Sequence, residues 1–211
     1  QKGQASEHWQ PRREASVNWR VLILLYGTAA AAYAGLAHHF WRTRWLQQPV
    51  TAGMAGWERG SILAACCLHA WLLYEALFLT EELRFGFALA LSAMLWLTVL
   101  IYWIESLVLS LEGMQALVLG VAAICVVLPG IFPGLAAPAA ARSFEFRTHT
   151  ILAVLAYGLF TMAALHALLM TLVERRLHGQ RRAVTLQGPL GALPPLLSME
   201  KLLFRLIAVG F

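Results

Sequence analysis

Charged side chains are scarce in this chain of 211 residues. Only 13% of the residues are Asp, Glu, Lys or Arg, while 60% are hydrophobic. Soluble domains are about 45–50% apolar even with glycine counted, so this composition excludes an ordinary soluble domain. The apolar stretches are continuous and rich in leucine and alanine, which excludes the alternating pattern of a membrane β-barrel. The sequence therefore predicts an all-α, polytopic helical membrane protein.

Motifs for redox and hydrolytic chemistry are also absent. The three cysteines, Cys66, Cys67 and Cys125, form no CxxC motif. This excludes a thioredoxin-like redox pair and the covalent attachment of c-type haem. A glycine-rich phosphate loop, a nucleophile elbow and an HExxH helix are missing as well, so hydrolase chemistry has no support. The net charge of +5 does not indicate nucleic acid, because the arginines lie at the ends of apolar runs, where they contact lipid headgroups.

The chain does contain a series of apolar runs of membrane length. A spanning helix needs about 20 apolar residues, and five runs meet this length, whereas a sixth begins and stops at the last residue. We expect a polar N-terminal tail over residues 1–18 and one transmembrane domain over residues 19–211, truncated at its C-terminus. The predicted spans are Trp19–Trp41, Gly60–Leu79, Phe85–Ile104, Met114–Phe132 and Thr148–Val173, with Leu202–Phe211 as the start of a sixth.

The loops between these runs differ in positive charge. Loops one, three and five share a side and carry eight Lys or Arg residues, against three in the opposite loops. Cytoplasmic loops carry the excess of Lys and Arg, so we expect the N-terminus outside and loop 174–201 in the cytoplasm. The N-terminal tail, with Lys2, Arg12, Arg13 and Arg20, argues for the opposite orientation, and the internal loops are given more weight. The eight are Arg42, Arg44, Arg59, Arg175, Arg176, Arg181, Arg182 and Lys201, and the three are Arg84, Arg142 and Arg147.

Histidines stand out at the ends of the fifth run. Ionisable side chains are costly in a bilayer and often mark functional sites, and imidazole binds metals and haem iron. His149 and His166 are about 25 Å apart along a helix axis, so the two cannot bind one iron. His166 shares a helix face with Met162 and Met170, which favours packing over ligation of haem or copper.

His69 lies in the second run, in the segment CCLHAWLLYEALF. A buried carboxylate at Glu75 needs a partner or a proton. His69, Tyr74 and Glu75 either form a hydrogen-bonding cluster that holds helices together, or His69 is a ligand. Six residues turn a helix by about 600°, so His69 and Glu75 should face different neighbours. We expect His69 to face the bundle interior, and Glu75 to find a hydroxyl, an indole or an arginine.

Several motifs together resemble a known family. FRTHTILAVLAYGLF, which contains His149 and Tyr157, is followed by ALHALLM, VERRLHG and LPPLLSMEKLLFRLIAVGF. The segments LHAWLLYEALF and LRFGFALALSAMLWLTVLIYW precede them. This order resembles the cytochrome c assembly membrane proteins, the CcsA-like group, and in particular its YpjD/HemX branch. The resemblance covers residues 19–211.

The resemblance implies a haem-handling protein of the bacterial inner membrane that serves cytochrome c maturation. His149 matches a histidine near the outer face, where the family handles haem, and His69 matches an intramembrane histidine of the haem-exporting members. Both are expected to bind non-covalent, b-type haem, in a site that further histidines complete. Membrane lipids and other cytochrome c assembly proteins are the expected partners, and no enzymatic activity is expected, because passing haem on changes no porphyrin bond. HemX-like members control haem synthesis, so a haem-free structural or regulatory subunit that binds a partner complex remains the alternative.

Overall fold

The structure is a computed structural model that describes residues 19–46, 53–79, 84–108, 113–136, 143–179 and 196–211. The predicted N-terminal tail, residues 1–18, lies outside this part of the chain. Within the described residues the secondary structure is almost entirely helical. The elements are α1 (Trp19–Phe40), the π-helical segment η1 (Trp41–Leu46), α2 (Gly56–Tyr74), the π-helical segment η2 (Glu75–Leu79), β1 (Arg84–Phe85), α3 (Phe87–Glu105), α4 (Met114–Cys125), α5 (Leu128–Ile131), β2 (Leu135–Ala136), α6 (Phe144–Gly179) and α7 (Leu196–Gly210).

Five helical segments are long and apolar enough to cross a membrane, which confirms the predicted all-α polytopic fold. Each overlaps one predicted span, but the ends differ. The largest difference is in α6, which begins at Phe144 rather than Thr148 and continues to Gly179. The helix continues into the charged flanks because its backbone hydrogen bonds do not require apolar side chains. The five segments are Val21–Arg44, Gly56–Leu79, Phe87–Glu105, Met114–Ile131 and Phe144–Leu172.

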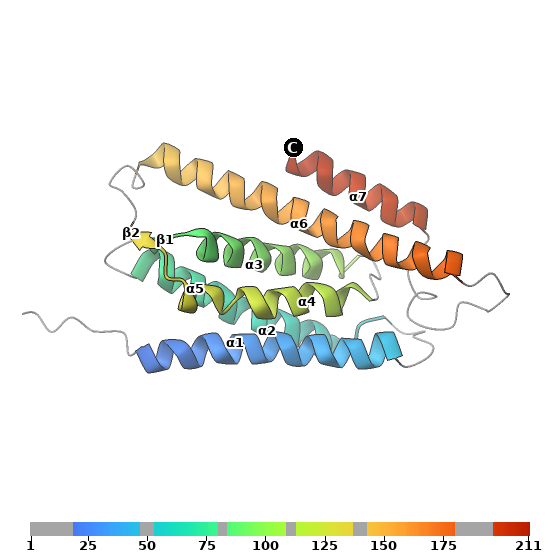
Figure 1. The fold of residues 1–211 in the computed structure, drawn as a ribbon, viewed down its shortest axis with the longest axis horizontal. Helices are drawn as coiled ribbons and strands as arrows, with labels where there is room; N and C mark the ends of the chain where they lie inside the picture. The colour runs from blue at the N-terminus through green and yellow to red at the C-terminus, as the bar shows by residue number, and fades with distance from the viewer. Residues whose placement is uncertain (1–18, 47–52, 80–83, 109–112, 137–142, 180–195) are drawn as a thin grey trace, which may run out of the picture.

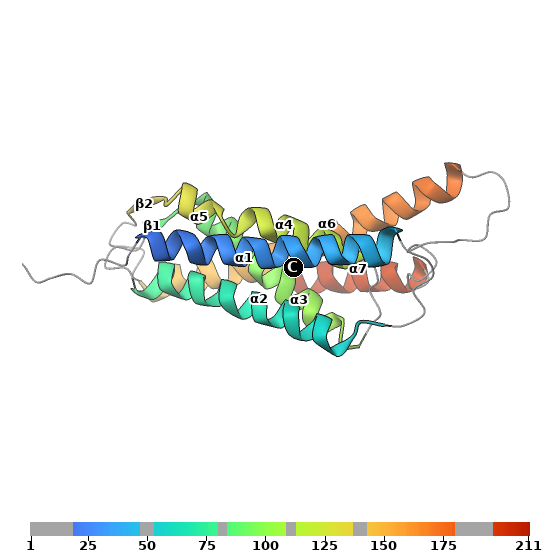
Figure 2. The same cartoon turned by 90° about the horizontal axis from the view of Figure 1, so that it is seen from below.

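The long helices lie side by side and consecutive ones run in opposite directions (Figures 1 and 2). α1 packs mainly against α4, α3 lies against both α4 and α6, and α7 packs along α6. The bundle therefore has two distinct ends. The strand end holds the start of α1, η2, the β1–β2 pair, α5 and the start of α6. The far end holds the end of α1, the start of α2 and the end of α3 (Figure 1).

Two glycines shape the strand end. β1 and β2 form a short antiparallel pair in which Arg84 lies opposite Ala136. Gly134 has a φ of +75°, a conformation that residues with a Cβ rarely adopt. A Cβ placed on Gly86 would lie only 3.0 Å from the Cα of Gly134. The pairing thus depends on both glycines, and it fixes the backbone that carries Arg84.

The helices pack around an apolar core, and α3 and α6 approach closely at Gly158. A Cβ there would lie 2.7 Å from Cδ2 of Leu97, and Oγ1 of Thr98 donates to the carbonyl of Gly158 at 3.2 Å. Small residues allow helix backbones to approach each other in this way in membranes. Large side chains buried in the core include Tyr33, Phe40, Ile62, Leu72, Tyr102, Met114, Leu119 and Met162.

Candidate functional site

His69 is completely buried and bonded to side chains of two other helices. Its Nε2 lies 2.9 Å from Oγ of Ser92 in α3, and its Nδ1 lies 3.4 Å from the hydroxyl of Tyr33 in α1. The ring of Tyr33 also packs edge-on against the imidazole, with ring centroids 5.7 Å apart. His69 therefore faces the bundle interior, as predicted, and links α1, α2 and α3.

This arrangement corrects the cluster expected from the sequence. The partners of His69 are Tyr33 and Ser92, which are distant in sequence. Tyr74 is exposed and stacks between Trp71 and Phe78 along the outside of α2 and η2. The local segment alone gave no signal for the true partners, because they come from helices that only the fold brings together.

In this conformation the hydrogen bonds of His69 compete with ligation of an iron. A neutral imidazole offers one N–H and one lone pair, and both ring nitrogens already face protein hydroxyls. An iron ligand would have to give up one of these bonds. His69 also lines neither the groove nor the cavity described below beside α2 and α3. Its observed role is to hold three helices together.

His149 is placed very differently. It lies in the second turn of α6, at the strand end, and its side chain is exposed. Its imidazole makes no hydrogen bond or ion pair within the part of the chain that the structure describes. The described residues also contain no group of three or more His, Cys, Asp or Glu side chains arranged to hold a metal ion. His149 is thus an available single ligand, and the structure does not bring it together with His69.

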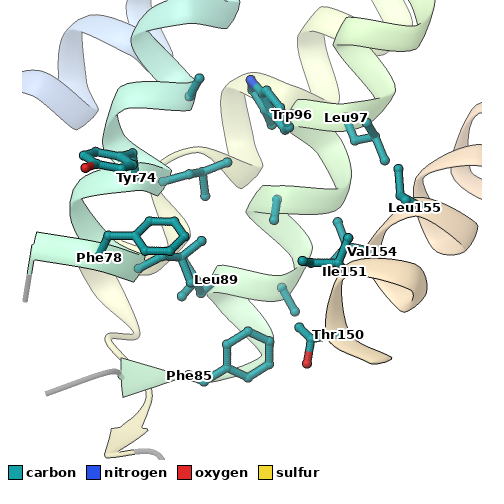
Figure 3. A pocket seen from close by; sticks show the side chains of 15 residues that line it. Tyr74, Phe78, Phe85, Leu89, Trp96, Leu97, Thr150, Ile151, Val154 and Leu155 are labelled. Carbon is teal, nitrogen blue, oxygen red and sulfur yellow. The ribbon is translucent and has the colours of Figure 1, made fainter. Parts of the chain in front are cut away.

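An apolar groove of about 330 Å³ lies between η2, α3 and the start of α6. Figure 3 shows Tyr74 and Phe78 on one side, Leu89 and Trp96 at the centre, and Ile151 and Val154 on the other side. The α6 residues in its wall are Thr150, Ile151, Val154 and Leu155. Because successive helical residues are rotated by about 100°, His149 lies on the opposite side of α6 from this wall. The groove and His149 do not form one site.

His166 has a ligand-like arrangement that the sequence interpretation did not favour. It is completely buried, and its Nδ1 lies 3.1 Å from the carbonyl oxygen of Met162. A carbonyl only accepts, so Nδ1 carries the proton and Nε2 presents a lone pair. No described atom bonds that Nε2. Metal-binding histidines commonly donate their other N–H to a backbone carbonyl in this way. The sequence carried no specific signal for this bond, because any residue four positions before a helical histidine supplies such a carbonyl.

A second polar cluster, which the sequence did not predict, lies at the far end. Glu58 is 4% exposed and its carboxylate accepts three hydrogen bonds. The donors are Nε2 of His39 at 2.9 Å, Nη2 of Arg44 at 3.0 Å and the backbone N–H of Ala55 at 2.8 Å. This pairing meets the requirement that a buried charge be matched. Since it joins η1 and the end of α1 to the start of α2, we interpret it as structural.

Comparison of the chain with protein-family models, with curated proteins and with solved structures found no match.

His149 and His166 each have an imidazole nitrogen available to bind a metal or haem iron. His149 offers an exposed imidazole at the strand end, and His166 offers a buried lone pair nearer the far end. An imidazole can act as an axial ligand of haem iron, but each of these stands alone among the described residues. Any site that used either one would need a second ligand from elsewhere.

Proposed function

We propose that this multi-pass membrane protein is a haem-handling protein of the bacterial inner membrane, of the cytochrome c assembly type. The observation that carries the proposal is His149, an exposed imidazole without a partner among the described residues. It stands at the start of α6, in the motif on which the family resemblance rests. Haem, when bound, would supply an iron that accepts imidazole nitrogens as ligands, and His149 would be one residue that holds it. A histidine outside the described residues, from this chain or another, would be the other.

The proposal places the strand end in the periplasm. It is supported by the excess of Lys and Arg in the loops at the far end. In this orientation, His149 faces the compartment in which cytochromes c are matured, while the Arg175–Arg182 segment faces the cytoplasm. His69 is left out of the proposed ligand set, because both of its ring nitrogens are bonded to protein hydroxyls.

The test is the absorption spectrum of the purified full-length protein after loading with haem. We expect low-spin bands typical of two nitrogen ligands. His149→Ala should lose or shift these bands, and added imidazole should partly restore them. His38→Ala is the matched control, since His38 is also an exposed histidine but lies at the far end. An unchanged spectrum in His149→Ala would remove His149 from the site.

A haem-free structural or regulatory subunit is the second candidate function. The specific observation in its favour is His69, whose buried imidazole serves helix packing rather than ligation. Such a protein would bind a partner membrane complex, or an enzyme of haem synthesis, through its arginine-bearing loops. It would show a clean baseline after haem loading, together with co-purification of the partner complex. The same spectrum therefore separates the two functions.

A further inference from the structure

A second cavity, of about 220 Å³, lies at the strand end. Its wall is built from α1, η2, β1, the start of α3, and α5 with the segment that follows it. Leu22, Leu89, Pro129 and Pro133 make much of the wall apolar, while Tyr26, Glu75 and Arg84 add polar groups. A buried water needs about 10–15 Å³ of such space, so the cavity is large enough for a group of several non-hydrogen atoms.

The two charged side chains of this cavity are not paired with each other. Glu75 is half-buried and Arg84 is exposed at the mouth, yet the structure contains no ion pair between them. Neither side chain makes a hydrogen bond within the described residues. A carboxylate at the end of a membrane bundle is normally matched by a partner. Glu75 and Arg84 therefore present one negative and one positive group to the same hollow.

We propose that this cavity binds a zwitterion with a primary ammonium and a phosphate, the headgroup chemistry of an aminophospholipid such as phosphatidylethanolamine. The ammonium would donate to the carboxylate of Glu75. The phosphate would accept from the guanidinium of Arg84, whose paired N–H groups can bind two phosphate oxygens at once. The cavity stands at the strand end, where headgroups of one leaflet lie.

The proposed chemistry discriminates between lipid headgroups. A primary ammonium has three N–H donors for a carboxylate, whereas the trimethylammonium of phosphatidylcholine has none. Quaternary ammonium groups are instead recognised by aromatic cages, and Tyr26 is the only aromatic residue in the wall. Phosphatidylglycerol would satisfy Arg84 but leave Glu75 without a cation. The cavity should therefore prefer phosphatidylethanolamine to both.

The apolar groove provides a neighbouring place for an acyl chain. Leu89 lines both the cavity and the groove, so the two hollows lie against the same side chain, which Figure 3 shows at the groove wall. A lipid with its headgroup beside Glu75 and Arg84 can pass a chain along Leu89 into the groove. This proposal does not depend on haem binding.

The experiment is a titration of the purified full-length protein in detergent, followed by native mass spectrometry. The added probes are phosphatidylethanolamine, phosphatidylcholine and phosphatidylglycerol with identical acyl chains, and soluble O-phosphoethanolamine as a competitor. We expect phosphatidylethanolamine to bind at least about tenfold more tightly than the other two lipids, as expected for one charge-assisted hydrogen bond. Binding of O-phosphoethanolamine together with no binding of any of the three lipids would identify the ligand as a free headgroup-like zwitterion.

Four variants connect this preference to the cavity. Glu75→Gln should abolish the preference for phosphatidylethanolamine over phosphatidylglycerol, and Arg84→Gln should weaken both by about tenfold. Glu145→Gln is the control at the same end, and Arg42→Gln is the control at the far end, since both are exposed and lie outside the cavity. Equal binding of the three lipids by the unaltered protein would overturn the proposal without any variant. So would a preference that Glu75→Gln and Arg84→Gln leave unchanged.

Discussion

At the scale of single residues, the hydrogen bonds of His69 explain why a polar ring is retained in the middle of an apolar bundle. The side chains of Ser92 and Tyr33 are 1% and 0% exposed, so water does not replace them if one is removed. A buried polar atom that loses its partner costs about 1–3 kcal/mol, whereas removing both partners together costs less. This asymmetry gives a direct test of the structural role.

We predict that Ser92→Ala lowers the free energy of unfolding by about 1–3 kcal/mol, because it leaves Nε2 of His69 buried without a partner. Adding both His69→Leu and Tyr33→Phe to Ser92→Ala should recover part of this loss, because no member of the hydrogen-bonded set then remains buried without a partner. Thr171→Ala is the control: Thr171 is exposed and bonds only the carbonyl of Ala167 in its own helix. The measurement is denaturant unfolding of the purified protein in detergent. Equal losses in Ser92→Ala and Thr171→Ala would show that the His69 bonds contribute nothing.

The sequence predicted the direction of His69 but not its contacts. An ionisable residue in a membrane run must face protein, which led correctly to the bundle interior. Ser92 and Tyr33 could not be identified as partners, since they belong to α3 and α1. For Glu75, the expected neighbours are present, because Tyr26 and Arg84 line the same cavity. The expected bond to one of them is not present in the described residues.

At the scale of elements, the length of the apolar runs predicted that the five helices exist. It did not predict where the helices end or where they approach each other closely. Runs of about 20 apolar residues must be helical in a bilayer to satisfy their backbone groups, and all five predicted spans are helical. The π-helical segments η1 and η2 were not predicted, because composition and apolar length do not distinguish π-helical from α-helical turns. The sequence also did not predict the close approach of α3 to α6 at Gly158, because the chain contains many glycines and their positions alone do not indicate which one lies at a helix contact.

We predict that Gly158→Leu forces α3 and α6 apart and lowers the free energy of unfolding by about 1–3 kcal/mol, as overpacking typically does. A Cβ added at this position would lie only 2.7 Å from Cδ2 of Leu97. The leucine side chain would also strain the hydrogen bond from Thr98 to the Gly158 carbonyl. Gly27→Leu is the matched control, because nothing lies within 4 Å of a Cβ there. Denaturant unfolding in detergent would measure both. A loss in Gly27→Leu as large as that in Gly158→Leu would refute the close-packing explanation.

At the scale of the whole molecule, the alternating directions of the long helices place the loops at the ends that the sequence predicted. Positive charge in the loops is concentrated at the far end, although not all of it is exposed. Arg44 is 9% exposed and bonds Glu58, and Arg59 donates to the carbonyl of Ser106. These two arginines therefore stabilise the fold, in addition to contributing positive charge that orients the protein in the membrane. The remaining arginines of the far-end loops still outnumber those of the strand end.

The final prediction concerns sidedness, on which the periplasmic placement of His149 and of the Glu75–Arg84 cavity depends. Positive-inside bias leads us to expect that a cysteine introduced at residue 143 is modified by a membrane-impermeant reagent added outside intact cells, and that one at residue 180 is protected until the cells are permeabilised. The background should replace Cys66, Cys67 and Cys125 by alanine, so that only the introduced thiol reports; two of these three native cysteines are buried. Labelling after permeabilisation controls for reactivity at both positions.

The reverse pattern would place the strand end in the cytoplasm. His149 would then face the wrong compartment for cytochrome c maturation, whereas the aminophospholipid site, which either leaflet can supply, would still stand.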